Sequence, residues 1–336
     1  MTTTTRTRVP NRSTRPRGLP PHGLLWLVLR QQRLALAVFA AAAIGLTLYA
    51  VQGRAATLDA ITQLNLPPCP PTESCPVPKA FNRDHVEPLR ALLSLLPLLP
   101  MALGLFLGGP VFSQEQESGT HRMVLSQSVT RGRWFLAKVS VPVLAAAAVS
   151  ATVTKAATDW WSLVHGRMGS DFGWMSWMPY DAIGPAPVAR AVLMVSIGIA
   201  CGVLLRRTVT AMGATALTAG ILLVALEQSR RFFRPMITTD GPFGRPLLPP
   251  GGSWEYDRGL TTATGAPAAV PEQCSPLDTT DKYLGCARDH GVTRQWVTYH
   301  PHSDLWPIQY TEAAICLTAA AAVLVFAWWW TRRRLR

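Results

Sequence analysis

The chain has 336 residues, of which 49% are apolar and 15% are charged, and its formal net charge at pH 7 is +13. Its apolar residues are bunched into long runs and do not follow the short periods of amphipathic helices or strands. This bunching argues against a soluble domain and indicates a membrane protein.

Six apolar runs are long enough to cross a bilayer. Each has roughly 18 to 24 residues, which as a helix at ~1.5 Å per residue approaches the ~30 Å hydrocarbon core. We therefore expect an all-α polytopic membrane protein with six transmembrane helices. The runs are Leu34 to Val51, Leu89 to Phe112, Val139 to Ala157, Val188 to Leu205, Val209 to Leu226 and Ala313 to Trp330.

The positive charges flank these runs on alternate sides. Residues 1–33, 114–138, 206–207 and 331–336 together hold 17 Arg or Lys residues and only two acidic residues, Glu115 and Glu117. By the positive-inside rule, these stretches and both termini are predicted to be cytosolic. The basic charge is thereby explained by contact with membrane lipid, and we predict no nucleic-acid partner.

The six cysteines agree with this topology. Cys69 and Cys75 fall in the first predicted outer loop, and Cys274 and Cys286 fall in the last. Because the outer side is oxidising, each pair is expected to form a local disulfide. No Cys-x-x-Cys spacing occurs, and the spacing of the histidines near residue 300 matches no helical ligand pattern, so we predict no metal site.

The predicted organisation follows from these runs. The long segment before the last run is rich in Pro and Gly, which favours loops with short strands or helical turns. The segment just before the first run could be an interfacial helix or a plain extension of the first span. In chain order we expect a disordered basic cytosolic tail (1–22), an interfacial helix (23–33), the first five transmembrane helices (34–227) with outer loops at 52–88 and 159–187, a loop-rich extracytoplasmic cap (228–310), and the sixth helix with a basic cytosolic tail (311–336).

Small residues and tryptophans predict how the spans pack. Gly104 and Gly108, and Gly198 and Gly202, have the four-residue spacing that lets helices approach closely. Packing within the chain is favoured over a homodimer seam. A cluster of tryptophans after the third span is interpreted as membrane-interface anchors, in preference to an aromatic substrate cage. Its members are Trp160, Trp161, Trp174 and Trp177.

No catalytic constellation is apparent. The chain lacks a P-loop, a G-x-S-x-G elbow and an H-E-x-x-H helix, so we predict no catalytic residues, no cofactor and no enzymatic activity. No Asp or Glu lies inside a predicted span, and Arg190 and Glu227 lie at span ends, where long side chains can reach the headgroups. This pattern mildly favours a bulky amphipathic or apolar cargo over an ion.

The most informative segment is residues 112–138, a polar stretch between two spans with the sequence FSQEQESGTHRMVLSQSVTRGRWFLAK. Gly119 is suited to the turn that ends a helix, and Thr120 can cap the next one. The pattern predicts a short helix held beneath the bilayer between two turns. An ordinary interfacial loop is an equally good interpretation of the pattern alone.

A resemblance to a known family favours the short helix over the interfacial loop. The order E-x-E-x-G-T-H-R from Glu115, followed by S-Q-S-V-T-R-x-R-W and then Lys138, resembles the loop between the second and third spans of type-2 ABC transporter permeases, especially those of actinobacteria. WLVLRQQR at Trp26 to Arg33 and RRTVTAM at Arg206 to Met212 are similar to segments of the same family.

The resemblance implies a function and partners. Such a permease is one half of an exporter in the plasma membrane. It pairs with a second copy or homologue, and it binds a separate cytosolic ABC ATPase through a coupling helix. The alternative is a permease-like module that does not transport but regulates or anchors another complex. By resemblance, the start of the coupling helix maps onto Glu115, Glu117, Gly119, Thr120, His121 and Arg122, and its return onto Arg131.

Overall fold

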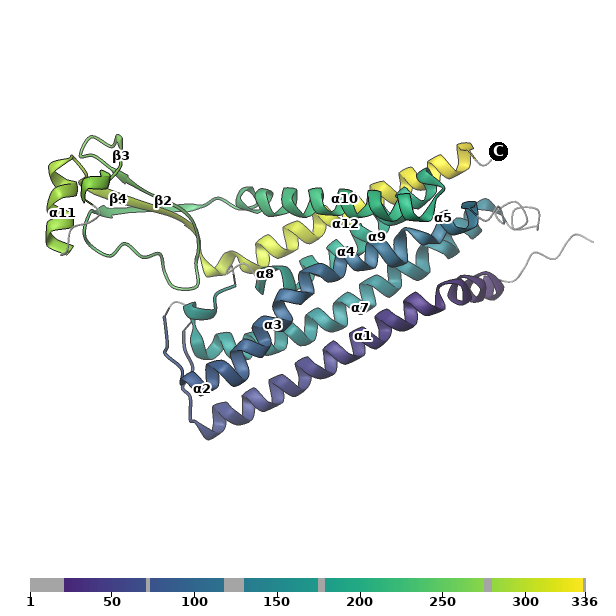
Figure 1. The fold of residues 1–336 in the computed structure, drawn as a ribbon, viewed down its shortest axis with the longest axis horizontal. Helices are drawn as coiled ribbons and strands as arrows, with labels where there is room; N and C mark the ends of the chain where they lie inside the picture. Colours follow the sequence, from purple (N-terminus) through teal and green to yellow (C-terminus); the bar gives the residue numbers. More distant parts are fainter. Residues whose placement is uncertain (1–20, 71–72, 118–129, 175–178, 275–279, 335–336) are drawn as a thin grey trace, which may run out of the picture.

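The computed structural model of the chain is a long bundle of helices with a small sheet-containing unit at one end (Figure 1). It describes residues 21–70, 73–117, 130–174, 179–274 and 280–334. Within these residues, six helical segments are long and apolar enough to span a membrane, and each contains one predicted run. The prediction of a mostly helical, six-span protein is confirmed. The spans are Val28–Gln63, Lys79–Glu117, Gly132–Met168, Pro185–Leu205, Thr208–Phe232 and His302–Arg333.

The secondary structure combines long helices with short helical turns. The helices are α1 (Pro21–Gln63), α2 (Lys79–Phe81), α3 (Glu87–Leu95), α4 (Leu99–Leu103), α5 (Pro110–Glu117), α7 (Arg131–Met168), α8 (Pro179–Ala182), α9 (Pro185–Leu205), α10 (Thr208–Ser229), α11 (Thr280–Asp289) and α12 (Leu305–Arg334). The short turns are η1 (Asn82–Val86), η2 (Leu96–Leu98), η3 (Gly104–Gly108), η4 (Ser170–Phe172), η5 (Arg230–Phe232), η6 (Glu272–Cys274) and η7 (His302–Asp304). The strands are β1 (Ile237–Pro242), β2 (Trp254–Thr261), β3 (Pro267–Ala268) and β4 (Arg294–His300).

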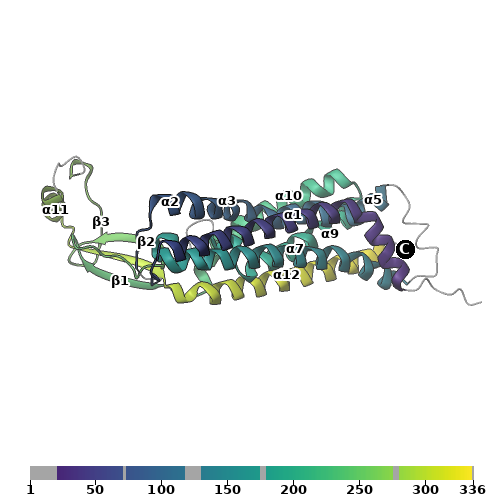
Figure 2. The same cartoon turned by 90° about the horizontal axis from the view of Figure 1, so that it is seen from below.

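Most spans are longer than their predicted runs, and the first and third illustrate the difference. The first helix, α1, is continuous from Pro21 to Gln63, so it includes both the predicted interfacial segment and residues assigned to the first outer loop. Figures 1 and 2 show its N-terminal part turning away from the axis of the rest of the helix. Likewise, α7 continues to Met168, beyond the predicted end at Ala157. Much of what the sequence predicts as outer loop is therefore helix.

The second span is irregular where its prolines lie. The 3-10 turn η2 separates α3 from α4 and contains Pro97, and Pro100 is the second residue of α4, where it is buried. A proline removes one backbone donor and disturbs the preceding turn, which accounts for the interruption.

The predicted glycine stripes pack against each other within the chain. A Cβ on Gly108 would lie 2.6 Å from the carbonyl oxygen of Val195, and one on Gly202 would lie 2.5 Å from that of Gly109. A Cβ on Gly198 would collide with the carbonyl oxygen of Gly104. The second span and α9 thus approach at backbone distance, and packing within the chain, not a homodimer seam, explains this glycine spacing.

The outer tryptophans form a core and do not face lipid. Trp160, Trp161 and Trp174 are all at most 3% exposed, and the Trp160 indole donates a hydrogen bond to Thr57 Oγ1 on α1 at 2.9 Å. Interface anchoring is therefore the wrong interpretation for these three residues, because tertiary packing between α1, α7 and α8 covers them. Trp177 lies outside the described residues.

The first disulfide holds the loop after α1 against the end of α7. Cys69 and Cys75 are bonded, with their Cα atoms 6.1 Å apart. The Cys69 amide donates to Gly166 O at 2.9 Å, and Ser170 N donates to Glu73 O at 2.8 Å. Gly169, between these contacts, has a positive φ of 60°, which a glycine adopts without strain.

The segment between α10 and α12 is more ordered than the predicted loop-rich cap. It contains a four-stranded antiparallel sheet in the order β1-β4-β2-β3, with α11 beside it (Figure 1). Cys274 and Cys286 are bonded and join η6 to α11. The expectation of short strands agrees with this structure, but Pro and Gly content alone did not reveal that they form one sheet.

The start of α1, the end of α5 and the end of α12 lie at one end of the bundle, and the sheet lies at the other (Figures 1 and 2). The side of the membrane on which each terminus lies stays a prediction. We call the end of the bundle where α1 starts and α5 and α12 end the terminal end, and we call the opposite end, which carries the sheet, the sheet end.

The glycine seam generates the first prediction. Gly198→Ala should lower the free energy of unfolding by about 1–3 kcal/mol, because the new methyl group meets backbone atoms that cannot rotate away. Thermal unfolding followed by tryptophan fluorescence in detergent measures the change. Gly213→Ala on α10 is the control, since no atom lies within 4 Å of its added Cβ. Equal transition temperatures for the two variants would contradict the close approach.

Candidate functional site

The predicted coupling residues divide between described and undescribed parts of the chain. Glu115 and Glu117 lie on the last turn of α5, and Arg131 is the first residue of α7. Gly119, Thr120, His121 and Arg122 fall on residues 118–129, outside the described residues. The structure therefore shows how the two ends of the predicted coupling segment are held.

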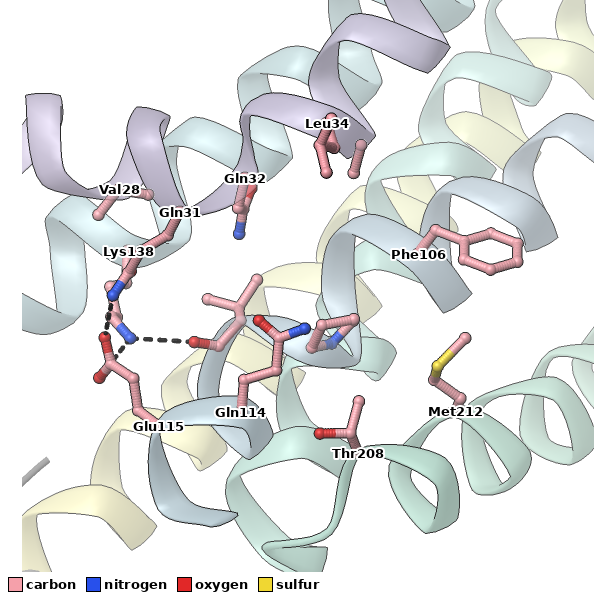
Figure 3. Close-up of a pocket in the computed structure, with 13 residues that line it drawn as sticks. Val28, Gln31, Gln32, Leu34, Phe106, Gln114, Glu115, Lys138, Thr208 and Met212 are labelled. Atoms are coloured by element: carbon pink, nitrogen blue, oxygen red, sulfur yellow. Dashed lines mark hydrogen bonds and ion pairs between the residues drawn. The ribbon is translucent and has the colours of Figure 1, made fainter. Parts of the chain in front are cut away.

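Glu115 is buried at the terminal end of the bundle. Its side chain is 8% exposed, and its Oε2 lies 2.6 Å from Lys138 Nζ on α7. Gln31 Nε2 on α1 donates a hydrogen bond to Glu115 Oε1 at 2.9 Å. Figure 3 shows the Gln31 and Lys138 side chains reaching the same carboxylate. One carboxylate thus links α5 to both α1 and α7.

Lys138 is the partner that the sequence did not identify. The residue marks only the end of the polar segment in the sequence, yet its side chain is 2% exposed. Its ammonium also donates to Val111 O at 3.0 Å and lies 5.2 Å and 5.1 Å from the ring centroids of Phe112 and Trp134. A buried ammonium persists only with such compensation, so Lys138 holds α7 to α5 at a fixed position.

Glu117 contacts the start of α10. Its Oε2 accepts a hydrogen bond from the Thr208 backbone N–H at 3.0 Å and another from the Thr208 hydroxyl at 2.8 Å. The chain reaches Thr208 through Arg206, whose left-handed backbone (φ 56°) makes the short turn after α9. The first backbone N–H groups of a helix lack partners within the helix, and a carboxylate there satisfies one and meets the positive end of the dipole.

A cavity of about 650 Å³ lies between α1, the second span and α10, beside the Glu115 and Lys138 pair (Figure 3). Gln32 and Leu34 line it from α1, Phe106 and Gln114 from the second span, and Met212 from α10.

Three segments that are distant in the sequence meet here. Gln31 belongs to WLVLRQQR, Glu115 and Glu117 to the polar segment, and Thr208 and Met212 to RRTVTAM. These are the segments in which the sequence resembles type-2 ABC permeases, and the cavity and its hydrogen bonds bring them together.

A comparison with protein families agrees with this grouping. Residues 36–231, more than half of the chain, match the family described as ABC-2 membrane transporter related. The chain belongs to this family. ABC-2 permeases are membrane transport modules that are generally not catalytic themselves and typically work with an ATPase partner. No curated protein and no solved structure matches the chain.

A second buried ionic cluster lies toward the sheet end of this ABC-2 protein. Glu312 is fully buried, and its carboxylate contacts Arg190 Nε at 2.5 Å and Arg230 Nε at 3.2 Å. Both arginines also pair with Asp181. The Tyr180 hydroxyl donates to Glu312 Oε2 at 2.8 Å. The cluster joins α8, α9, η5 and α12.

The two arginines of this cluster stabilise the ionised form of Asp181. Burial alone would raise the pKa of Asp181, but Arg190 and Arg230 outweigh it and hold that pKa below its usual value. The expectation that Arg190 reaches the headgroups from its span end is wrong, since its side chain is 2% exposed. Five charged or phenolic residues near the ends of different spans were the only sequence signal for this cluster.

One further group of potential metal ligands occurs among the described residues. The ligand atoms of Cys274, Cys286 and His290 lie within 4.8 Å of one another. The two sulfur atoms are bonded to each other, so they are not available as thiolate ligands.

The buried pair generates a prediction about stability. Lys138→Met should lower the free energy of unfolding by about 3–5 kcal/mol, because the Glu115 carboxylate stays buried without its cation. The double variant Glu115→Gln with Lys138→Met should recover most of this loss, because it leaves no unpaired charge. Thermal unfolding in detergent measures all three proteins.

A surface pair on the same helix provides the control. Lys155 and Asp159 lie 2.5 Å apart, but their side chains are 73% and 44% exposed. Lys155→Met should therefore change stability by no more than about 1 kcal/mol. If Lys138→Met and Lys155→Met lowered the free energy of unfolding equally, the Glu115 and Lys138 pair would be no more important for stability than an exposed ion pair.

Proposed function

We propose that the chain is the membrane-spanning permease subunit of an ABC exporter, of the actinobacterial type that its loop motif resembles. It lies in the plasma membrane, pairs with a second copy or homologue, and couples to a separate cytosolic ATPase. Membership of the ABC-2 family supports the permease role. The observation that carries the coupling role is the attachment of both ends of residues 112–138 to other spans.

Through this attachment, a displacement of the coupling segment would move the spans that contact it. On the incoming side, Glu117 contacts α10 and Glu115 contacts α1 and α7. On the outgoing side, α7 begins at Arg131 and carries Lys138 two turns later. An ATPase that grips the intervening residues, Gly119 to Arg122 among them, displaces α5 and α7 together. Since α1 and α10 are bonded to α5, they move with it as a rigid body.

Co-purification tests the permease role directly. The tagged protein, extracted from its native host in a mild detergent, should retain an ABC ATPase at near-stoichiometric amounts, identified by mass spectrometry. Retention of a sensor kinase or another membrane complex in its place, with no ATPase, would favour the non-transporting module. The experiment requires no knowledge of the cargo.

The coupling role predicts a specific effect of Glu117. Glu117→Ala should lower the ATPase rate of the assembled complex about fivefold, because loss of a helix cap costs about 1 kcal/mol and frees α10 from α5. The complex should still assemble, since Glu115 and Lys138 remain in place. The ATPase rate of purified complex in lipid nanodiscs measures the effect.

The matched control is Glu227→Ala, an exposed carboxylate near the opposite end of the same helix. It should leave the ATPase rate unchanged. Thr208→Val, which removes the hydroxyl donor, should resemble Glu117→Ala, and the double variant should be no worse than either. Additive losses would show that the two residues act separately and would count against the coupling contact.

A further inference from the structure

The ionic cluster at the sheet end contains a buried donor that it does not use. Arg190 donates through Nε to Glu312 Oε1 at 2.5 Å and through Nη1 to Asp181 Oδ1 at 2.6 Å. Its third nitrogen, Nη2, is buried and has no hydrogen-bond partner among the described residues. Since a buried donor without an acceptor costs free energy, a second arrangement of the cluster that engages Nη2 would recover part of this cost.

Three of the elements around the cluster are held firmly to one another. Buried apolar residues of α9 and α12 pack in one cluster. The side chain of Gln309 on α12 accepts a hydrogen bond from Ala186 N at the start of α9 and donates one to Tyr180 O on α8, both at 2.9 Å. We call α8, α9 and α12 the fixed unit. It carries both carboxylates of the cluster and Arg190.

Arg230 reaches the cluster from outside the fixed unit. It is the first residue of η5, directly after α10, and it pairs with Asp181 and Glu312 while its guanidinium lies 4.3 Å from the ring centroid of Tyr180. The span that it ends is loosely packed, because 22% of the apolar part of that span is buried inside the bundle, against 72% for the span formed by α9. Arg230 thus ties the sheet-side end of a loosely packed helix to the fixed unit.

The unused donor of Arg190 suits the carboxylate that Arg230 would leave. Asp181 Oδ1 accepts from Arg190 Nη1, and Asp181 Oδ2 accepts from Arg230 Nη1 at 3.4 Å. In a planar guanidinium, neighbouring N–H groups match the two oxygens of one carboxylate. A rotation of the Asp181 carboxylate can therefore convert its single contact with Arg190 into a bidentate one. Asp181 is also 22% exposed, so water reaches it when Arg230 leaves.

We propose that Arg230 is a releasable latch. In the state described here, it docks the end of α10 on Asp181 and Glu312. In a second state, α10 and η5 move away, and Arg190 binds Asp181 through both Nη1 and Nη2 while the fixed unit stays in place. The sheet moves with α10, because β1 follows η5 closely along the chain (Figure 1). The latch goes beyond the proposed permease role, since the second state requires neither an ATPase nor a cargo.

Hydrogen–deuterium exchange of the full-length protein in nanodiscs tests the latch by comparing two segments. Residues 226–232 contain the end of α10 and η5, and residues 179–189 contain α8 and the start of α9. In Arg230→Gln, exchange of 226–232 should become about tenfold faster, in keeping with the loss of a charged hydrogen bond. Exchange of 179–189 should stay unchanged, because Arg190 takes over Asp181. Arg245→Gln, which removes an exposed arginine of the sheet-containing unit, should alter neither segment.

A second substitution shows whether Asp181 is the residue that Arg190 takes over. Added to Arg230→Gln, Asp181→Asn should leave exchange of 226–232 where it is, because that segment is already released. It should accelerate exchange of 179–189 about fivefold, because Arg190 loses its charged acceptor on α8. A cooperative tryptophan unfolding transition establishes that each variant is folded. Arg230→Lys, which keeps the charge but lacks the planar fork, should give the same pattern at smaller size and replaces Arg230→Gln if the latter unfolds.

Three results would overturn the latch. Equal acceleration of both segments in Arg230→Gln would show that the cluster opens as one unit. Unchanged exchange of 226–232 would show that Arg230 does not hold the end of α10. Unchanged exchange of 179–189 on adding Asp181→Asn would show that Arg190 does not take over Asp181. All of these measurements use the permease alone, so the latch and the permease role can fail separately.

Discussion

The ion pair between Glu115 and Lys138 is the interaction on which the terminal end of the bundle depends. Both side chains are almost fully buried, so neither charge is tolerable without the other. The pair is also unusually well supported, by Gln31 on the carboxylate and by Val111 O and two aromatic faces around the ammonium. Such a pair contributes little net stability compared with apolar packing, but it allows only one relative position of α1, α5 and α7. The relative position of these helices matters because residues 112–138 begin on α5 and end on α7.

The protein repeats this arrangement at its other end with different residues. Asp181, Glu312, Arg190 and Arg230 form a closed cluster of two anions and two cations, and it fastens α8, α9, η5 and α12. Between the two clusters, glycines bring the backbones of α9 and the second span close together, and Leu107, Val195 and Ile199 belong to the buried apolar cluster around this contact. A close backbone contact of this kind resists sliding, because any shift brings larger side chains against a carbonyl. The bundle is thus fixed by charge at both ends and by steric fit in the middle.

The sequence predicted the features that depend on composition over long windows. Six apolar runs and the charges beside them were enough for six spans, and the cysteine positions were enough for two pairs that are bonded in the structure. It failed where a partner far along the chain decides the environment. Lys138 and Arg190 carry the signature of residues that reach water, and only Glu115 on α5 and Glu312 on α12 make them interior residues. Trp160 was misassigned for the same reason, since Thr57 and Gly53 on α1 form its site.

The two clusters also constrain which helix can carry motion from one end of the bundle to the other. The segment formed by α10 and η5 touches both of them: Thr208 at its start binds Glu117, beside the Glu115 pair, and Arg230 at its end binds Asp181 and Glu312. Along most of its length between these points, α10 has an exposed outer face, with Leu217 and Ile221 more than 60% exposed. A helix held by polar contacts at its two ends and loosely packed between them tilts more readily than one that is embedded, as α9 is. In the proposed transport cycle, displacement at residues 112–138 therefore reaches the sheet end through α10, and the sheet follows directly from η5 along the chain.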